Sequence, residues 1–176
     1  MVQRIIYPHD GGVAVLICHD ADGEPLQDLP IAEIARKDVP ATVPYRIVDE
    51  ADLPADRSQR ELWTADFSEP DGYGIGAFAW HKERQFARIG DLLSIEPPAP
   101  AEGAIAPEVE AAHAAFIAAV EAVEATVNSL PDIDPSQHDN DVLFREVPEA
   151  LRSAWATYQE ALQLAEEEPV EEEPLE

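Results

Sequence analysis

The alternation of apolar and polar positions predicts that the first part of the chain mixes short strands with short helices. Residues 3–7 and 13–18 are apolar, β-branched runs separated by a turn sequence that contains two glycines. Such a pattern predicts a β-hairpin. Residues 45–48 predict a third strand, because polar and apolar side chains alternate there.

Helices are expected at several places between and after these strands. Residues 31–37 suit a short helix, and residues 77–93 suit a longer basic one with apolar side chains near one face. Asp56 is a suitable cap for a further short helix over residues 56–63. Residues 66–76 are rich in turn formers and predict a loop.

The second half of the chain carries two stronger helical patterns. Residues 108–130 are rich in alanine, which has the highest helix propensity. Their apolar stripe consists of Val109, Phe116, Val120, Val123, Val127 and Leu130. Residues 148–164 form a second helix, whose stripe consists of Leu151, Trp155, Tyr158 and Leu162. Two striped helices with a polar connection predict an antiparallel αα-hairpin, because neither helix is stable alone.

A proline-rich segment separates these two halves. Residues 96–107 contain four prolines and are typical of a linker. The predicted organisation is an N-terminal module over 1–95, a helical hairpin over 108–168 and a disordered acidic tail over 169–176. The expected fold class is α+β, with the β-hairpin and short helices in the N-terminal module.

Charge and composition narrow the functional classes. The chain has 45% hydrophobic residues and a formal net charge of -26, and residues 91–176 hold 2 Lys+Arg and 21 Asp+Glu, a net charge of -19. Such a chain repels the phosphate backbone of nucleic acid, so direct binding to it is not expected. We expect no membrane-spanning helix and no secretion signal. The single cysteine, Cys18, fits a reducing compartment.

No motif predicts catalysis, a cofactor or a metal site, so we expect a protein that is not an enzyme. Cys18 and His19 are adjacent, and neighbouring strand residues face opposite sides, so a buried structural cysteine is favoured over a nucleophile. Residues 131–141 resemble the start of a calcium loop but lack its glycine and its final glutamate. The glycines within residues 72–76 lack the spacing of a phosphate-binding loop.

The helix over 148–164 resembles the C-terminal signature of phage tail assembly chaperone proteins. That signature reads roughly Leu, then Ala-Trp, Tyr-Arg and Leu at helical spacing. The matching residues are Leu151, Ala154, Trp155, Tyr158 and Leu162. The chain departs from the signature at Gln159, where the family usually has arginine.

A second resemblance covers residues 3–63, which are similar to short phage proteins encoded near tail-fibre genes. The blocks that carry it are residues 31–40, 44–48, 54–57 and 62–63. Neither resemblance implies a catalytic residue. Together they imply a phage or prophage protein that aids tail or tail-fibre assembly by binding a tail polypeptide, in the host bacterial cytoplasm or in the virion tail.

The resemblance and the residue types nominate a set of partner-binding side chains. These candidates are Leu151, Trp155, Tyr158, Leu162 and Trp63. Aromatic residues are enriched at binding hot spots, but the aromatics at 155 and 158 equally suit packing inside the hairpin. Two other functions stay open: a structural component of the virion tail, and an acidic nucleic-acid mimic that inhibits a host defence protein.

Overall fold

The computed structural model describes residues 2–19, 27–57, 62–98, 105–131 and 142–167. The chain divides into two compact units, unit 1 (Met1–Trp80) and unit 2 (His81–Glu176). Within the described residues, a four-stranded antiparallel sheet and four α-helices give a mixed α+β structure. This confirms the fold class that the sequence predicts.

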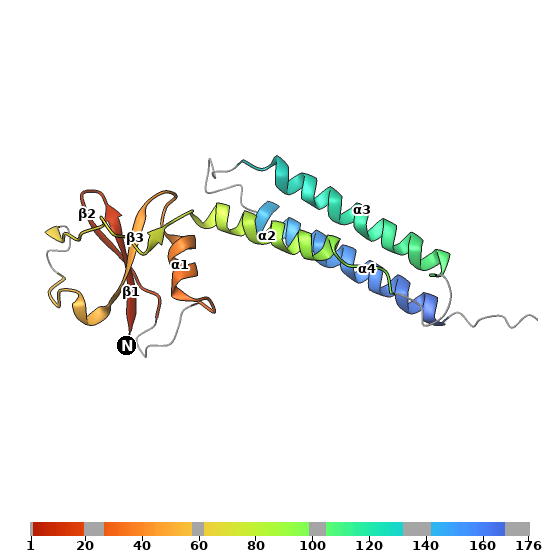
Figure 1. Ribbon diagram of the computed structural model, residues 1–176, viewed down its shortest axis with the longest axis horizontal. Helices are drawn as coiled ribbons and strands as arrows, with labels where there is room; N and C mark the ends of the chain where they lie inside the picture. Colours follow the sequence, from red (N-terminus) through yellow and green to blue (C-terminus); the bar gives the residue numbers. More distant parts are fainter. Residues whose placement is uncertain (1, 20–26, 58–61, 99–104, 132–141, 168–176) are drawn as a thin grey trace, which may run out of the picture. The chain divides into compact units, whose positions relative to one another are not determined.

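Unit 1 contains the sheet, whose strands follow the order β2-β1-β3-β4 (Figure 1). The strands are β1 (Gln3–His9), β2 (Gly12–Leu16), β3 (Pro44–Asp49) and β4 (Gly72–Tyr73). Asp10 and Gly11 connect β1 to β2, with φ values of 48° and 80°. Positive φ at both positions is typical of the two-residue turns that match the twist of a β-hairpin.

Helix α1 (Ile31–Asp38) covers one face of this sheet. Alternate residues of a strand point to the same face, and Ile5 and Tyr45 both point toward the helix. There they pack with Ile34 and Val39, and Ile5 and Val39 are both 0% exposed. Burial of these side chains supplies the main hydrophobic stabilisation of unit 1.

The short strand β4 lies inside residues 66–76, where the sequence predicts a loop. Backbone hydrogen bonds hold this segment in place, since the Gly74 N–H donates to the Val43 carbonyl at 2.9 Å and the Thr42 N–H donates to the Gly74 carbonyl at 2.9 Å. A Cβ at position 74 would collide with the backbone carbonyl of Val39. Glycine is therefore required here for close backbone approach.

The prediction of a short helix over residues 56–63 is wrong for its first two residues. Asp56 and Arg57 are not helical, and residues 58–61 lie outside the described part of the chain. Leu62, near the end of the expected helix, is in a 3-10 helical turn. Another short helical turn, η1 (Glu50–Asp52), directly follows β3.

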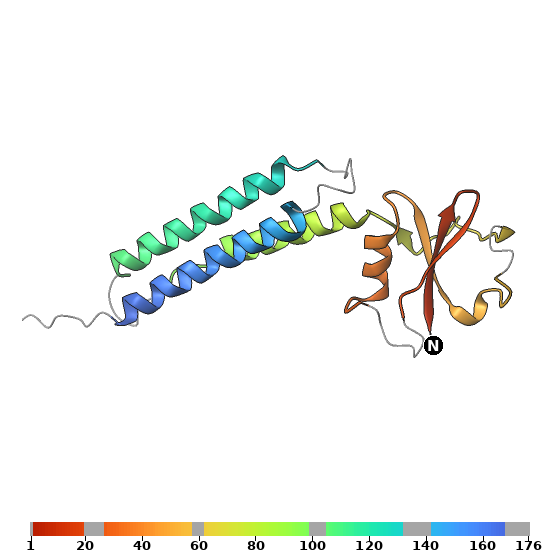
Figure 2. The same ribbon diagram turned by 180° about the vertical axis from the view of Figure 1, so that it is seen from behind.

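Unit 2 is helical. It contains most of α2 (Ala77–Leu93), then α3 (Pro107–Ser129), one π-helical turn η3 (Val142–Glu146) and α4 (Val147–Glu167). Helices α3 and α4 lie side by side and run in opposite directions in both views (Figure 1, Figure 2). Phe116, Val120 and Val127 of α3 and Leu151 of α4 are buried. The predicted stripes thus face the interior of the unit, as expected for amphipathic helices.

Helix α2 belongs with α3 and α4 from His81 onward, which differs from the predicted boundary at residues 96–107. The Lys82 ammonium donates to the Leu130 carbonyl at 2.7 Å, and His113 Nε2 lies 2.7 Å from the Ile95 carbonyl oxygen. At the beginning of α2, the Trp80 indole N–H instead donates to Glu33 of α1 at 2.8 Å, inside unit 1. Side-chain contacts, rather than proline content, therefore set the division between the units.

Several expectations fall outside the described residues. The acidic tail over 169–176, most of the calcium-like loop and the centre of the proline-rich segment are among them. In the described part of the chain, no helix combines the length and the apolar character needed to cross a lipid bilayer.

Candidate partner-binding surface

Four of the five candidate side chains come together on α4, and the fifth lies in unit 1. Leu151 is 0% exposed and Tyr158 is 2% exposed, whereas Trp155 and Leu162 are half-buried. Trp63 is half-buried in unit 1. Leu151 and Tyr158 thus pack inside the helical unit, and their role as direct partner contacts stays a prediction.

The aromatic residues of α4 join it to α3. The rings of Phe116 and Tyr158 stack with centroids 4.9 Å apart and planes inclined by 13°. Trp155 contacts both of them, with ring centroids 5.7 Å from Phe116 and 5.8 Å from Tyr158. Such pairs contribute about 0.5–1.5 kcal/mol each beyond their burial. The stripe that resembles a family signature thus stabilises the helix pair.

Beside this aromatic cluster, α3 and α4 form an open groove of about 430 Å³, which we call the α3–α4 groove. Its lining is dominated by small side chains, with the rings of Phe116 and Tyr158 among them. The small residues that line it are Ala112, Ala115, Ala119, Ala150, Ser153, Ala154, Thr157 and Ala161. The groove is therefore mainly apolar, and it exists because the small side chains along it leave space between the two helices.

The sequence places these small residues on one face of each helix. Ala112, Ala115 and Ala119 are separated by three and four residues, which is the spacing of neighbours on a helix surface. Ala150, Ala154 and the residues after them repeat this spacing on α4. Alanine also maintains the helix without covering its backbone. The stripes of large apolar residues do not predict this surface, because the small residues that form it lie beside those stripes.

The electrostatic environment of the groove is acidic. Helix α3 contains four glutamates and neither lysine nor arginine. The exposed residues Glu108, Glu146 and Glu160 continue the rows of groove residues by steps of three or four. The one basic residue of α4, Arg152, lies two positions from both Ala150 and Ala154, which directs it away from the groove.

Tyr158 is unusual among the groove residues. Its hydroxyl is buried and has no hydrogen-bond partner among the described residues. Burial raises the pKa of the Tyr158 phenol above its ordinary value of 10.0, so the group is neutral at pH 7. A buried hydroxyl without a partner costs free energy of about 1–3 kcal/mol.

Trp63 lines a second pocket, of about 360 Å³, on the sheet face opposite α1. Ile6, Val13 and Val48 contribute from the strands, and Leu53 follows η1. This pocket is formed within unit 1 and carries apolar walls. Because Trp63 lines this pocket, it remains a candidate contact residue at a place separate from the candidates on α4.

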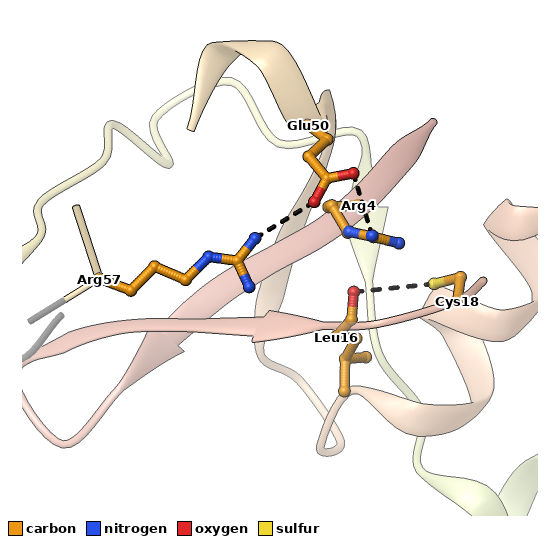
Figure 3. Close-up of polar contacts among 5 residues, drawn as sticks. All are labelled: Arg4, Leu16, Cys18, Glu50 and Arg57. Carbon is orange, nitrogen blue, oxygen red and sulfur yellow. Dashed lines mark hydrogen bonds and ion pairs between the residues drawn. The ribbon is translucent and has the colours of Figure 1, made fainter. Parts of the chain in front are cut away.

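Figure 3 shows a three-residue ionic network of Arg4, Glu50 and Arg57. The two arginines line a small cavity together with Trp63. Glu50 lies between two arginines, with its oxygens 3.1 Å from Arg4 and 3.2 Å from Arg57. The side chain of Arg4 is 9% exposed, while that of Arg57 is 49% exposed. The buried ion pair between Arg4 and Glu50 therefore contributes more to stability than the pair between Arg57 and Glu50, because water screens the exposed Arg57.

Cys18 is buried, as the sequence predicts. Its side chain is 2% exposed, and its thiol lies 3.9 Å from the Leu16 carbonyl oxygen (Figure 3). Burial is the main cause that raises the pKa of the Cys18 thiol. Since the thiolate is the nucleophile, this environment suits a structural cysteine and opposes a catalytic one.

The histidines on the helices contact aromatic rings. His81 stands edge-on to Phe144 with ring centroids 4.4 Å apart, and His113 lies near Tyr158 at 5.8 Å. Within the ranges that the structure describes, no three His, Cys, Asp or Glu side chains form a group able to hold a metal ion.

Comparisons with protein-family models, with curated proteins and with solved structures found no match to this chain.

Proposed function

We propose that this chain is a phage or prophage protein that aids tail or tail-fibre assembly by binding a tail polypeptide, without catalysing a reaction. The α3–α4 groove is the observation that carries the proposal. It is an open, mainly apolar groove with a volume of about 430 Å³, and it lies on an acidic helical unit. The resemblance of α4 and of residues 3–63 to phage tail proteins supplies the biological setting.

The physical mechanism is shielding of an aggregation-prone segment. Unassembled tail polypeptides expose apolar surfaces that are buried only in the finished tail, and such surfaces aggregate. The groove provides small apolar side chains against which one such segment packs. The net charge of -26 keeps the complex soluble through mutual repulsion between complexes.

This mechanism places the protein in the host bacterial cytoplasm during assembly. A chaperone leaves its partner when the tail forms, so it is absent from finished particles. A structural component would stay in the virion tail at a fixed ratio. Mass spectrometry of purified virions separates these two functions, and a stoichiometric amount of this chain would favour the structural one.

The test of the proposal is co-expression with the tail or tail-fibre polypeptide encoded beside this protein. We expect the soluble fraction of the tail polypeptide to rise and the two chains to co-elute in size-exclusion chromatography. Co-expression with an unrelated acidic protein of similar size is the control for a general effect of charge. Unchanged solubility together with separate elution would contradict the proposed function.

A further inference from the structure

We infer that the α3–α4 groove binds one amphipathic helix, which carries large apolar side chains on one face and lysine or arginine beside that face. The inference rests on the proposed function, because it names the kind of segment that a tail polypeptide would present. The size of the groove side chains, the length of the groove and the charges around it support this inference.

The dimensions of the groove fit a helix. On α3 it extends from Ala112 to Val123, and on α4 from Ala150 to Ala161. Each stretch is about 17 Å long at 1.5 Å per residue, or three helical turns. A third helix laid along this length packs its ridges between two rows of small side chains. Because the side chains that line the groove are small, the large side chains that fill it must come from the bound helix.

A large exposed residue continues one wall. Leu164 is 60% exposed and follows Thr157 and Ala161 by steps of seven and three residues, so it lies on the same face of α4. An exposed leucine in line with an apolar groove lengthens the surface available to a partner.

The acidic residues beside the groove favour basic residues on both sides of the apolar stripe of the bound helix. Glu108, Glu146 and Glu160 are exposed and border the groove, whereas the Arg152 side chain is on the opposite face of α4. A helix with lysine or arginine beside its apolar stripe pairs with these carboxylates and is steered toward them. A helix with acidic flanks is repelled.

A second copy of this chain is disfavoured as the occupant. Two copies would bring two helical units together, and in each unit residues 81–176 hold 5 Lys+Arg and 22 Asp+Glu, a net charge of -17. Like charges placed across an interface oppose association. The occupant is therefore a partner of opposite charge.

The experiment uses the full-length chain and three synthetic 18-residue peptides. The first peptide is an amphipathic helix of leucine and lysine, the second replaces its lysines with glutamate, and the third replaces its leucines with serine. Fluorescence anisotropy measures binding at low and at high salt. We expect the leucine-lysine peptide alone to bind, and its affinity to fall as salt screens the charges.

Two matched variants locate the binding site. Ala119→Arg adds bulk and positive charge inside the groove, and Ala114→Arg adds the same side chain at an exposed position of α3 that does not line it. Both substitutions keep a good helix former, and circular dichroism checks the fold. We expect Ala119→Arg to weaken peptide binding by about tenfold or more and Ala114→Arg by less than about twofold.

Each alternative outcome overturns the inference. Equal effects of the two arginine variants would place the peptide elsewhere, and equal binding of the serine-lysine peptide would show attraction by charge alone. A dimer that Ala119→Arg dissociates would identify a second copy as the occupant. A tail polypeptide complex that survives Ala119→Arg would reject the helix-binding groove while retaining the proposed function. Peptide binding without any tail polypeptide complex would reject the proposed function alone.

Discussion

The ring of Tyr158 on α4 stacks on the ring of Phe116 on α3, with centroids 4.9 Å apart and planes inclined by only 13°. Both side chains are almost fully buried, at 2% and 3% exposure. This pair joins two helices that are distant in sequence, and the same two rings line the α3–α4 groove. This one contact therefore contributes both to the stability of the helix pair and to the shape of its open surface.

Replacing Phe116 with alanine should destabilise the protein by about 3–5 kcal/mol, because it leaves a cavity and removes the stacked ring. Urea unfolding followed by circular dichroism measures the loss. Leu164→Ala is the control, since Leu164 is 60% exposed and its truncation should cost less than about 0.5 kcal/mol. Similar losses for both variants would contradict the role of Phe116 in the core.

Tyr158→Phe should leave stability unchanged or raise it by about 1 kcal/mol. The substitution keeps the stacked ring and removes a buried hydroxyl that has no partner in the described part of the chain. The shift of the urea midpoint reports the difference. A loss above about 1 kcal/mol would show that the hydroxyl makes a favourable bond in solution.

Glu50→Ala should cost about 1–3 kcal/mol, because it leaves the buried Arg4 guanidinium without its carboxylate. The matched variant Arg57→Ala removes the exposed partner of the same carboxylate and should cost less than about 1 kcal/mol. Thermal unfolding of the two variants tests this order. The reverse order would show that the Arg57 pair carries the stabilisation.

Two glycines should respond to alanine in opposite directions. Gly74→Ala should destabilise by about 1–3 kcal/mol, since its Cβ would strike the Val39 carbonyl. Gly90→Ala should stabilise by about 0.5–1 kcal/mol, because Gly90 is exposed in helix α2 and a Cβ there meets no atom within 4 Å. Chemical unfolding of both variants measures whether the free energy of unfolding falls for Gly74→Ala and rises for Gly90→Ala.

The thiol of Cys18 should be unreactive in the native protein at pH 8. Burial raises its pKa above the ordinary value of 9.0, so the folded state favours the protonated thiol. The contribution of this group to stability is complete below the unfolded pKa and is lost as the pH rises through the folded pKa. Alkylation by iodoacetamide should be slow in buffer and fast in urea, and equal rates would contradict the buried position.

The local elements could be predicted because their signals are local. The strand at residues 3–7 lies in an apolar, β-branched run, and the strand at residues 45–48 shows period-two alternation. The helices at residues 77–93 and 108–130 show a continuous helical period. The side chain at Phe116 could also be assigned to an interior stripe from spacing alone. These features depend on residues a few positions apart, so the chain specifies them without knowledge of its neighbours.

The tertiary structure decided three features that no short stretch encodes. Strand β4 contains only two residues and exists because β3 pairs with it. The division at Trp80 and His81 depends on contacts between α2 and distant helices. The groove depends on which alanine-rich faces of α3 and α4 meet and which stay uncovered. Sequence spacing defines the faces of a helix, whereas packing against other elements determines which face is left open to a partner.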